Sequence, residues 1–239
     1  MREIKAVIFD LYGTLISVHT DEDSLARLWK PLSFFYAFHG ARYAPKELRA
    51  AYRSAVAEEE ARLSAGGKLA EICIETVFAR LYRDRGAEPT ETLVRDTASM
   101  FRACSMCRIE PYPGARELLK ELRAAGKRVC LLSNAQRAFT QAEIEMFGLD
   151  ECFDELLLSS DWEVKKPDHA YFACLLSRLP FSADEIIMVG NSAHDDIRPA
   201  RELGLHACFL NTDGDPSRPD CDLVCDGADY AALKKWLLG

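Results

Sequence analysis

An aspartate at the end of a short apolar segment is the residue of this chain whose setting most clearly indicates chemistry. Asp10 follows Val7-Ile8-Phe9, which is typical of a buried strand, and Gly13 and Thr14 come soon after it. A carboxylate at the mouth of a buried strand is able to act as a nucleophile or to bind a cation. The same residue also suits a plain turn, because Asp favours turns. The residues that end the later strands decide between the two interpretations.

Polar residues also follow three later apolar segments. They are Ser133 with Asn134, Lys166 before Pro167, and Asn191 with Asp195 and Asp196. In a parallel sheet, ligands bind beyond the carboxyl ends of the strands, so we expect these groups to meet Asp10 and Thr14 in one pocket. A carboxylate that attacks an anionic phosphate needs a cation and fixed donors to offset the repulsion of like charges. The set contains both, and this favours a catalytic site.

The elements that would position these groups alternate between strand and helix from about residue 108 onward. The segment Gly114–Ala125, for example, has leucines on one face and stops at Gly126. Such alternation predicts an α/β fold with a parallel sheet and helices on both faces. The other predicted strands are Arg128–Leu132, Phe153–Leu158, Glu185–Val189, His206–Leu210 and Leu223–Val224. The other predicted helices end at Phe147 or span Asp168–Arg178, Asp195–Leu203 and Ala228–Leu238.

Residues 19–107 have helical patterns and few strand-like segments. The predicted helices are Leu25–Phe38, Pro45–Ala65, Leu69–Arg83 and Thr90–Arg102. This pattern predicts an inserted α-helical cap domain at 19–107 and a core domain made of 1–18 and 108–239. The acidic stretch Thr20-Asp21-Glu22-Asp23 reads as a helix start. The aromatic residues predicted to form the core of the insertion are Trp29, Phe34, Phe35, Tyr36 and Phe38.

Composition and charge restrict the class of protein. Of the 239 residues, 49% are hydrophobic and 28% are charged, as in soluble globular proteins. The formal net charge of −8 and the lack of a basic tract argue against nucleic-acid binding, whereas a local pocket is still able to take a small anionic substrate. No apolar segment is long enough to span a bilayer, and the first residues lack a signal-peptide pattern. A cytoplasmic protein is therefore expected, and the oligomeric state is not specified.

Nine cysteines and several histidines could carry other chemistry. Cys104 and Cys107 form a CxxC pair, but the second close pair, Cys221 and Cys225, has a different spacing and lies over a hundred residues away. We therefore expect buried thiols rather than structural zinc. Among the histidines next to the polar motifs, His194 is the best candidate for proton transfer, because it lies inside the last motif. The others are His19 and His169.

The order and spacing of the motifs resemble those of the haloacid dehalogenase superfamily of hydrolases, and the helical insertion resembles the helical cap of that superfamily. The resemblance extends over the whole chain. It implies that Asp10 attacks the substrate and becomes a covalent aspartyl ester. It also implies that Thr14 and Ser133, with Asn134 beside it, hold the transferring oxygens, and that Lys166 pairs with the nucleophile and the substrate anion.

Two departures from the phosphatases of this superfamily weaken the expected cofactor site. Tyr12 stands where they have a second Asp that transfers protons, and Asn191 stands where they have an acidic metal ligand. Mg²⁺ accepts hard oxygen ligands, including carbonyl and amide oxygens. A weakened magnesium site is therefore predicted from the residues Asp10, Tyr12 (through its carbonyl), Asn191, Asp195 and Asp196.

The stretch from Asp10 to Leu15 is similar to that of the 2-haloacid dehalogenases, which lack the second Asp and need no metal. Asn191, Ala193 and Phe172 differ from the Ser, Asn and Tyr of those enzymes, although Tyr171 is adjacent to Phe172. The sequence therefore predicts a Mg²⁺-dependent, phosphatase-like hydrolase of a small phosphorylated metabolite. A dehalogenase-like hydrolase of carbon–halogen bonds and a non-catalytic binding or regulatory protein are the alternatives.

Tyr12 adds an expectation about the substrate. A phenol has a reference pKa of about 10 and is a poor base at neutral pH. A phosphatase with Tyr12 in this position is therefore expected to prefer acyl or aryl phosphates, whose leaving groups need little protonation.

Overall fold

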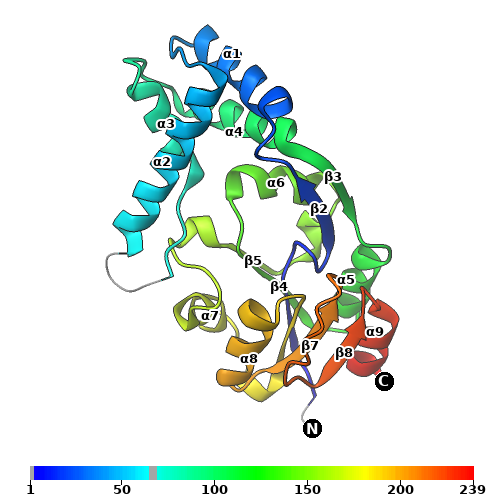
Figure 1. Cartoon of the computed structure of the whole chain (residues 1–239). Helices are drawn as coiled ribbons and strands as arrows, with labels where there is room; N and C mark the ends of the chain where they lie inside the picture. Colours follow the sequence, from blue (N-terminus) through cyan, green and yellow to red (C-terminus); the bar gives the residue numbers. More distant parts are fainter. Residues whose placement is uncertain (1–2, 65–68) are drawn as a thin grey trace.

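The central element of the structure is a six-stranded parallel sheet with the strand order β5-β4-β1-β6-β7-β8 (Figure 1). The structure is a computed structural model and describes residues 3–64 and 69–239. The strands are β1 (Ala6–Phe9), β4 (Arg128–Ser133), β5 (Glu155–Leu158), β6 (Ile186–Gly190), β7 (His206–Asn211) and β8 (Leu223–Asp226). The predicted α/β class is confirmed, and the predicted strands lie within a few residues of these bounds.

Helices cover both faces of this sheet. The helices α5 (Ala115–Ala124), α6 (Arg137–Met146) and α9 (Tyr230–Leu238) contribute to one buried cluster, and α7 (His169–Leu176) and α8 (Arg198–Glu202) contribute to another. Strand β1 explains the division, because its side chains alternate between the two faces. Val7 and Phe9 belong to the first cluster, whereas Ala6 and Ile8 belong to the second. A strand that is buried on both faces reads as a continuous apolar run.

The strand order places the first polar motif at a topological switch point. Strand β1 pairs with β4 on one side and with β6 on the other. Asp10 follows β1, Ser133 ends β4 and Gly190 ends β6. Since all three strands are parallel, their carboxyl ends lie at the same edge of the sheet, where a crevice for a ligand forms.

The helical insertion lies between two strands that pair with each other. Strands β2 (Ile16–Thr20) and β3 (Met106–Pro111) form an antiparallel two-stranded sheet that was not predicted. Between them lie the helices α1 (Lys30–Phe38), α2 (Pro45–Ser64), α3 (Ile74–Arg83) and α4 (Glu91–Ser105). Figure 1 shows these helices gathered at the end of the molecule away from the two termini. They share a buried cluster, against which Ala138 and Phe139 of α6 also pack. The expected boundaries at 18/19 and 107/108 therefore fall inside paired strands.

Two predicted helix starts in the insertion are wrong. Helix α3 begins at Ile74 rather than at Leu69, because contacts with the core hold the preceding segment in another conformation: the carbonyl of Leu69 accepts from the Lys165 amide, and the carbonyl of Ile72 accepts from the Gln136 side chain. The acidic stretch at 20–23 does not begin a helix either. Instead, Ser24 caps the π-helical turn Leu25–Trp29. The predicted end of the second helix, Ala65, lies outside the described residues.

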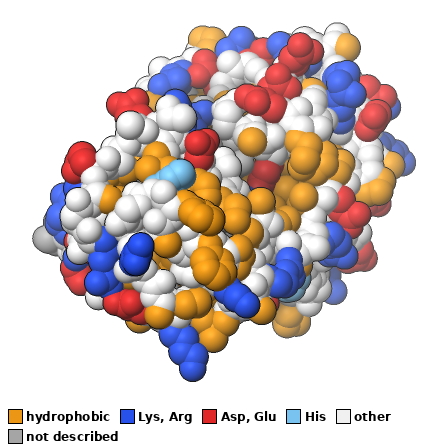
Figure 2. Space-filling view, turned by 90° about the horizontal axis from the view of Figure 1, so that it is seen from above, with side chains coloured by type: hydrophobic (Ala, Val, Ile, Leu, Met, Phe, Trp, Pro, Cys, Tyr) orange, Lys and Arg blue, Asp and Glu red, His pale blue; other side chains and the backbone are white. Residues whose placement is uncertain are grey.

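The predicted aromatic core of the insertion is only partly correct. Trp29 and Tyr36 are buried, but Phe34 and Phe38 are 55% and 86% exposed. These two residues are four positions apart, so they lie on the same outward face of α1. Figure 2, which views this end of the molecule from above, shows hydrophobic side chains at the surface. Within the described residues, no helix is both long and apolar enough to cross a membrane.

Phe101 is the side chain whose removal should weaken the insertion most. It is fully buried and lies within 6 Å, centroid to centroid, of Trp29, Tyr52, Phe78 and Phe139. We expect Phe101→Ala to lower the free energy of unfolding by about 3–5 kcal/mol, because the substitution leaves a cavity that the surrounding aromatic rings cannot move in to fill. Phe38→Ala, on the exposed face, should change it by less than about 0.5 kcal/mol. Urea denaturation of both variants tests this, and equal effects would contradict it.

Candidate active site

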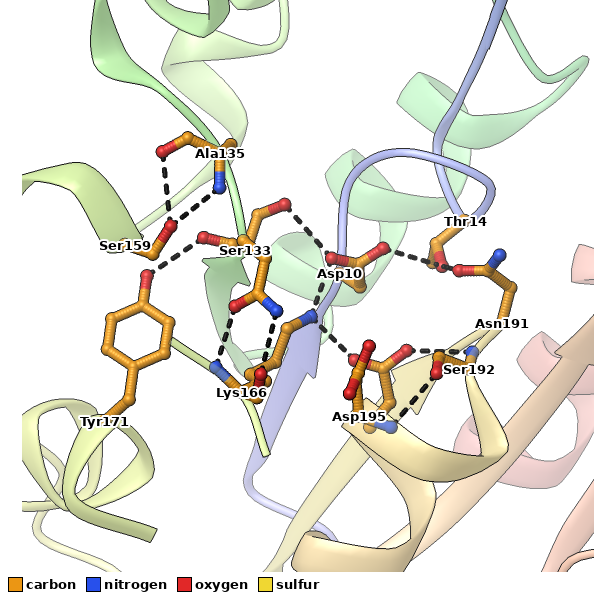
Figure 3. A network of polar contacts seen from close by, with 12 residues as sticks. Asp10, Thr14, Ser133, Ala135, Ser159, Lys166, Tyr171, Asn191, Ser192 and Asp195 are labelled. Atoms are coloured by element: carbon orange, nitrogen blue, oxygen red, sulfur yellow. Dashed lines mark hydrogen bonds and ion pairs between the residues drawn. The ribbon is translucent and has the colours of Figure 1, made fainter. Parts of the chain in front are cut away.

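Asp10 is held by one carboxylate oxygen and leaves the other nearly free. Oδ1 accepts from the Ser133 hydroxyl at 3.0 Å and from Lys166 Nζ at 2.7 Å (Figure 3). Oδ2 accepts only a long bond of 3.4 Å, from the Thr14 hydroxyl. The side chain is nearly buried, at 7% exposure. A carboxylate that is fixed in this way keeps a free lone pair on Oδ2, which suits nucleophilic attack.

Lys166 is a buried cation shared by two carboxylates. Its Nζ lies 2.7 Å from Asp10 Oδ1 and 2.6 Å from Asp196 Oδ1. Burial alone would lower the pKa of Lys166, but the two carboxylates outweigh it and raise the pKa above its ordinary value. The ammonium therefore stays charged beside the nucleophile. Burial also raises the pKa of Asp196 to about 6, although Lys166 opposes that shift.

Asn134 and Tyr171 hold the backbone of residues that contact Asp10. The Asn134 amide donates to the Lys166 carbonyl at 3.0 Å and accepts from the Lys166 amide at 2.7 Å, so both ends of its side chain hold the lysine backbone. The Tyr171 hydroxyl donates to the carbonyl of Ser133 at 3.0 Å. Sequence reasoning had noted Tyr171 only as a neighbour of Phe172. Its burial follows from the face of α7 that packs on the sheet.

Two glycines give the site its room. A side chain on Gly190 would place its Cβ only 2.2 Å from Asp196 Oδ2, so Asp196 is able to reach Lys166 only because this residue lacks one. Gly13 has a φ of +79°, which favours glycine, and its Cβ would lie 2.3 Å from Asn191 Nδ2. The approach of Gly13 to Asn191 joins the loop after β1 to the end of β6, and the approach of Gly190 to Asp196 lies within the segment that ends β6. The first apolar segment and the last motif thus depend on each other.

Asn191 and Asp195, two of the predicted metal ligands, have other partners. Asn191 accepts from the Thr14 hydroxyl at 3.2 Å and donates to Asp213 at 2.7 Å. Asp195 lies 2.7 Å from His194 Nδ1, and the exposed His194 ring does not line the cavity at Asp10. His19 and His169 do not line this cavity either, so these three histidines do not reach the nucleophile.

Tyr12 lies beside the nucleophile, but its hydroxyl is hydrogen-bonded to residues of the core helix α6. The hydroxyl donates to Glu143 Oε2 at 2.5 Å and lies 2.9 Å from Thr140 Oγ1. Burial, followed by the charge of Glu143, raises the pKa of Tyr12 above its ordinary value. Tyr12 therefore stays protonated at neutral pH and is no base. The network of Tyr12, Glu143 and Thr140 was not predicted from the sequence.

The predicted residues surround a small cavity of about 220 Å³. Its lining consists of Asp10, Tyr12, Ser133, Asn134, Lys166, Asn191, Ser192, Asp195 and Asp196. Thr14 lies behind the nucleophile and does not line the cavity. With three carboxylates and one ammonium, the lining carries a formal charge of −2 when Asp196 is ionised. A cavity of this size admits only a small molecule or the reacting end of a larger one.

The five predicted magnesium ligands, Asp10, Tyr12, Asn191, Asp195 and Asp196, all line this cavity, but several of them are occupied by protein partners. The carboxylates of Asp10 and Asp196 both face the Lys166 ammonium, and the oxygen of Asn191 faces Thr14. Within residues 3–64 and 69–239, no group of three or more His, Cys, Asp or Glu side chains is arranged to hold a metal ion. The cysteines of this part of the chain are free thiols.

Comparison with known proteins identifies the family. A model of the haloacid dehalogenase-like hydrolases matches residues 4–204. The chain belongs to the haloacid dehalogenase-like hydrolases. Its membership agrees with the resemblance stated from the sequence and makes hydrolase its general class. The family alone does not fix the substrate.

The relatives of this haloacid dehalogenase-like hydrolase include enzymes of both substrate classes. It is 26% identical over 224 residues to an (S)-2-haloacid dehalogenase of Burkholderia cepacia, covering 89% of this chain and 85% of that protein. It is 27% identical over 193 residues to a pyrophosphatase of Halalkalibacterium halodurans, covering 81% and 77%. A solved 2-haloacid dehalogenase of Pseudomonas syringae has the same fold, with a TM-score of 0.71, 21% identity and coverage of 98% and 99%.

The space beside Gly190 leaves no room for a side chain. We expect Gly190→Ala to push Asp196 away from Lys166 and to lower turnover by roughly 10²-fold, the loss typical of a displacement of about 1 Å in catalytic groups. Turnover is to be measured with 2-haloacids and aryl phosphates, and the variant's crystal structure would show the Lys166–Asp196 distance. Unchanged turnover in a folded variant would show that Asp196 is dispensable.

Proposed function

We propose that this protein is a hydrolase in which Asp10 forms a covalent ester with a small anionic substrate without a metal ion, and that 2-haloacid-like carbon compounds are the substrate class that the site suits best. The observation that carries the proposal is the electrostatics of the cavity. Its lining has three carboxylates and one ammonium. A phosphate dianion would be repelled there unless a cation were added, whereas a monoanionic carboxylate would be repelled less.

The geometry of Asp10 supports attack on carbon. Its Oδ2 is nearly free and attacks the carbon that bears the leaving group. The carbon–halogen bond breaks, and the halide leaves with the electron pair. Lys166 stays charged, and after Asp10 has become a neutral ester its charge is balanced by Asp196. Water then adds to the ester carbonyl, which releases the hydroxyacid and one proton and restores the Asp10 carboxylate.

Tyr12 is compatible with this chemistry. A halide is a stable anion and needs no proton as it leaves, so the first step requires no general acid. Asp196, whose pKa burial raises to about 6, is a carboxylate of the cavity lining that is able to accept a proton from the water. The relatives that are (S)-2-haloacid dehalogenases support the same substrate class.

Phosphoryl transfer is the second candidate function. The pyrophosphatase relative favours it, and so does a solved phosphatase of the family from Thermococcus onnurineus, whose fold matches with a TM-score of 0.65 at 21% identity. The Ser133 hydroxyl is a donor suited to a phosphate oxygen.

The proposal also keeps the cytoplasmic location, the small anionic substrate, and the division into a core (1–18 and 108–239) and a cap (19–107).

Replacement of the nucleophile tests covalent catalysis. We expect Asp10→Asn to lower halide release from 2-chloropropionate by at least roughly 10³-fold, because the amide is a poor nucleophile of nearly the same shape. Mass spectrometry of a single turnover should find the ester on the peptide that contains Asp10. Asp150 is exposed, so Asp150→Asn serves as the matched control and should keep wild-type activity. Wild-type turnover in Asp10→Asn would rule out the covalent mechanism.

Chelation separates the two candidate functions. We expect halide release to continue unchanged in excess EDTA, because Lys166 already supplies the cation at Asp10. Phosphate release that needs added Mg²⁺ would instead support phosphoryl transfer. In that case aryl phosphates should react roughly 10²–10⁴-fold faster than alkyl phosphates, because Tyr12 cannot protonate the leaving group. Tyr12→Asp should then narrow this difference, and a wild type that cleaves both classes equally would contradict the role given to Tyr12.

A further inference from the structure

A buried ion pair joins the insertion to the core and contacts Tyr12, two residues after Asp10. Arg102 of α4 binds Glu143 of α6 through Nε at 2.5 Å and through Nη2 at 3.2 Å. The Arg102 side chain is 15% exposed and the Glu143 side chain 7% exposed. Glu143 also accepts the hydroxyl hydrogen bond of Tyr12, whose second partner is Thr140. One carboxylate therefore joins a helix of the insertion, a helix of the core and the loop after Asp10.

The aromatic contacts around Arg102 reinforce this junction. The guanidinium lies 5.5 Å from the ring centre of Phe139 and 5.6 Å from that of Tyr12. The neighbouring Phe101 stacks on Phe139 at 5.9 Å with an interplanar angle of 11°. Helix α4 is thus fixed on α6 by charge and by stacking together. Such a contact would by itself serve only to dock the insertion.

The position of Tyr12 gives the junction a functional consequence. Tyr12 is two residues after Asp10 and lines the cavity of the nucleophile. The loop that follows it is tightly hydrogen-bonded: the Gly13 amide donates to the Ile16 carbonyl at 2.8 Å, and the Leu15 amide donates to the Leu11 carbonyl at 2.7 Å. A shift of Tyr12 would therefore move the backbone next to Asp10. Since Oδ2 of Asp10 has only the long Thr14 bond, its direction depends on that backbone together with the contacts of Oδ1.

We infer that Glu143 and Arg102 are positioning residues, which hold the Tyr12 hydroxyl and through it aim the free oxygen of Asp10 when α4 is docked on α6. The inference rests on the proposed function and deepens it. Catalysis by Asp10 is thereby tied to the docked position of the insertion. A partner that is removed from a buried pair leaves an uncompensated charge, so the network should respond as one unit.

A double-mutant cycle between Glu143→Gln and Tyr12→Phe tests the inference. Each single variant should lower kcat for the turned-over substrate by about 10-fold while KM stays within about 2-fold, because the aim of the nucleophile changes and the binding of substrate does not. The double variant should be no slower than the slower single variant. Additive losses, or a loss confined to KM, would overturn the inference. Glu145→Gln, an exposed glutamate on the same helix, is the matched control and should keep wild-type kcat.

A readout that needs no turnover keeps the test independent of the proposed function. Hydrogen exchange of the backbone amides of residues 11–16 should be faster in Glu143→Gln and in Tyr12→Phe than in the wild type. The double variant should show the same acceleration as either single variant, and Glu145→Gln should exchange at the wild-type rate. If the wild type hydrolyses no substrate, the proposed function fails while this measurement still judges the network. Unchanged exchange in this segment would overturn the inference even if Asp10 is catalytic.

Discussion

The burial of one ammonium between two carboxylates is the interaction on which the rest of the site depends. Lys166 is held 2.7 Å from Asp10 and 2.6 Å from Asp196, and all three are nearly inaccessible to water. Charges removed from water cost several kcal/mol each unless partners are placed accurately around them. Much of the surrounding structure serves that placement. Asn134 fixes the lysine backbone, and Gly190 leaves the space that Asp196 needs.

This constraint explains why the residues at the strand ends could be predicted from the sequence. The three charged groups follow β1, β5 and β6, and the parallel sheet, in which β4 separates β1 from β5, brings their loops to one edge. An apolar run that ends in a polar residue is a local signal, so Asp10, Ser133 and Asp196 were recognised without a structure. The alternation of strands and helices predicted the sheet in the same way. The roles of these side chains in catalysis stay predictions.

What the sequence could not predict depends on contacts between distant segments. The segment before α3 was predicted to be helical, but Leu69 and Ile72 are bound by the core nearly a hundred and more than sixty residues further along the chain, respectively. The pairing of β2 with β3 joins the two ends of the insertion, and neither strand is apolar enough to be recognised alone. Glu143 lies in the predicted helix that ends at Phe147, and nothing local in the sequence marks it as buried. Its burial is understandable only once Arg102 and Tyr12 are seen to share it.

The use of Tyr12 links the fold to the chemistry of the leaving group. A carboxyl group at this position would be free to pass a proton to a departing alkoxide. Here the side chain is instead bonded to Glu143 and stays neutral, because burial and the adjacent carboxylate raise its pKa. The Tyr12 side chain thus serves the packing of the fold and supplies no proton. Catalysis loses nothing by this only if the leaving group departs as a stable anion. A halide satisfies that condition, as do the leaving groups of aryl and acyl phosphates, whereas an alkoxide does not, so the buried network that docks the insertion disfavours substrates whose leaving group needs a proton.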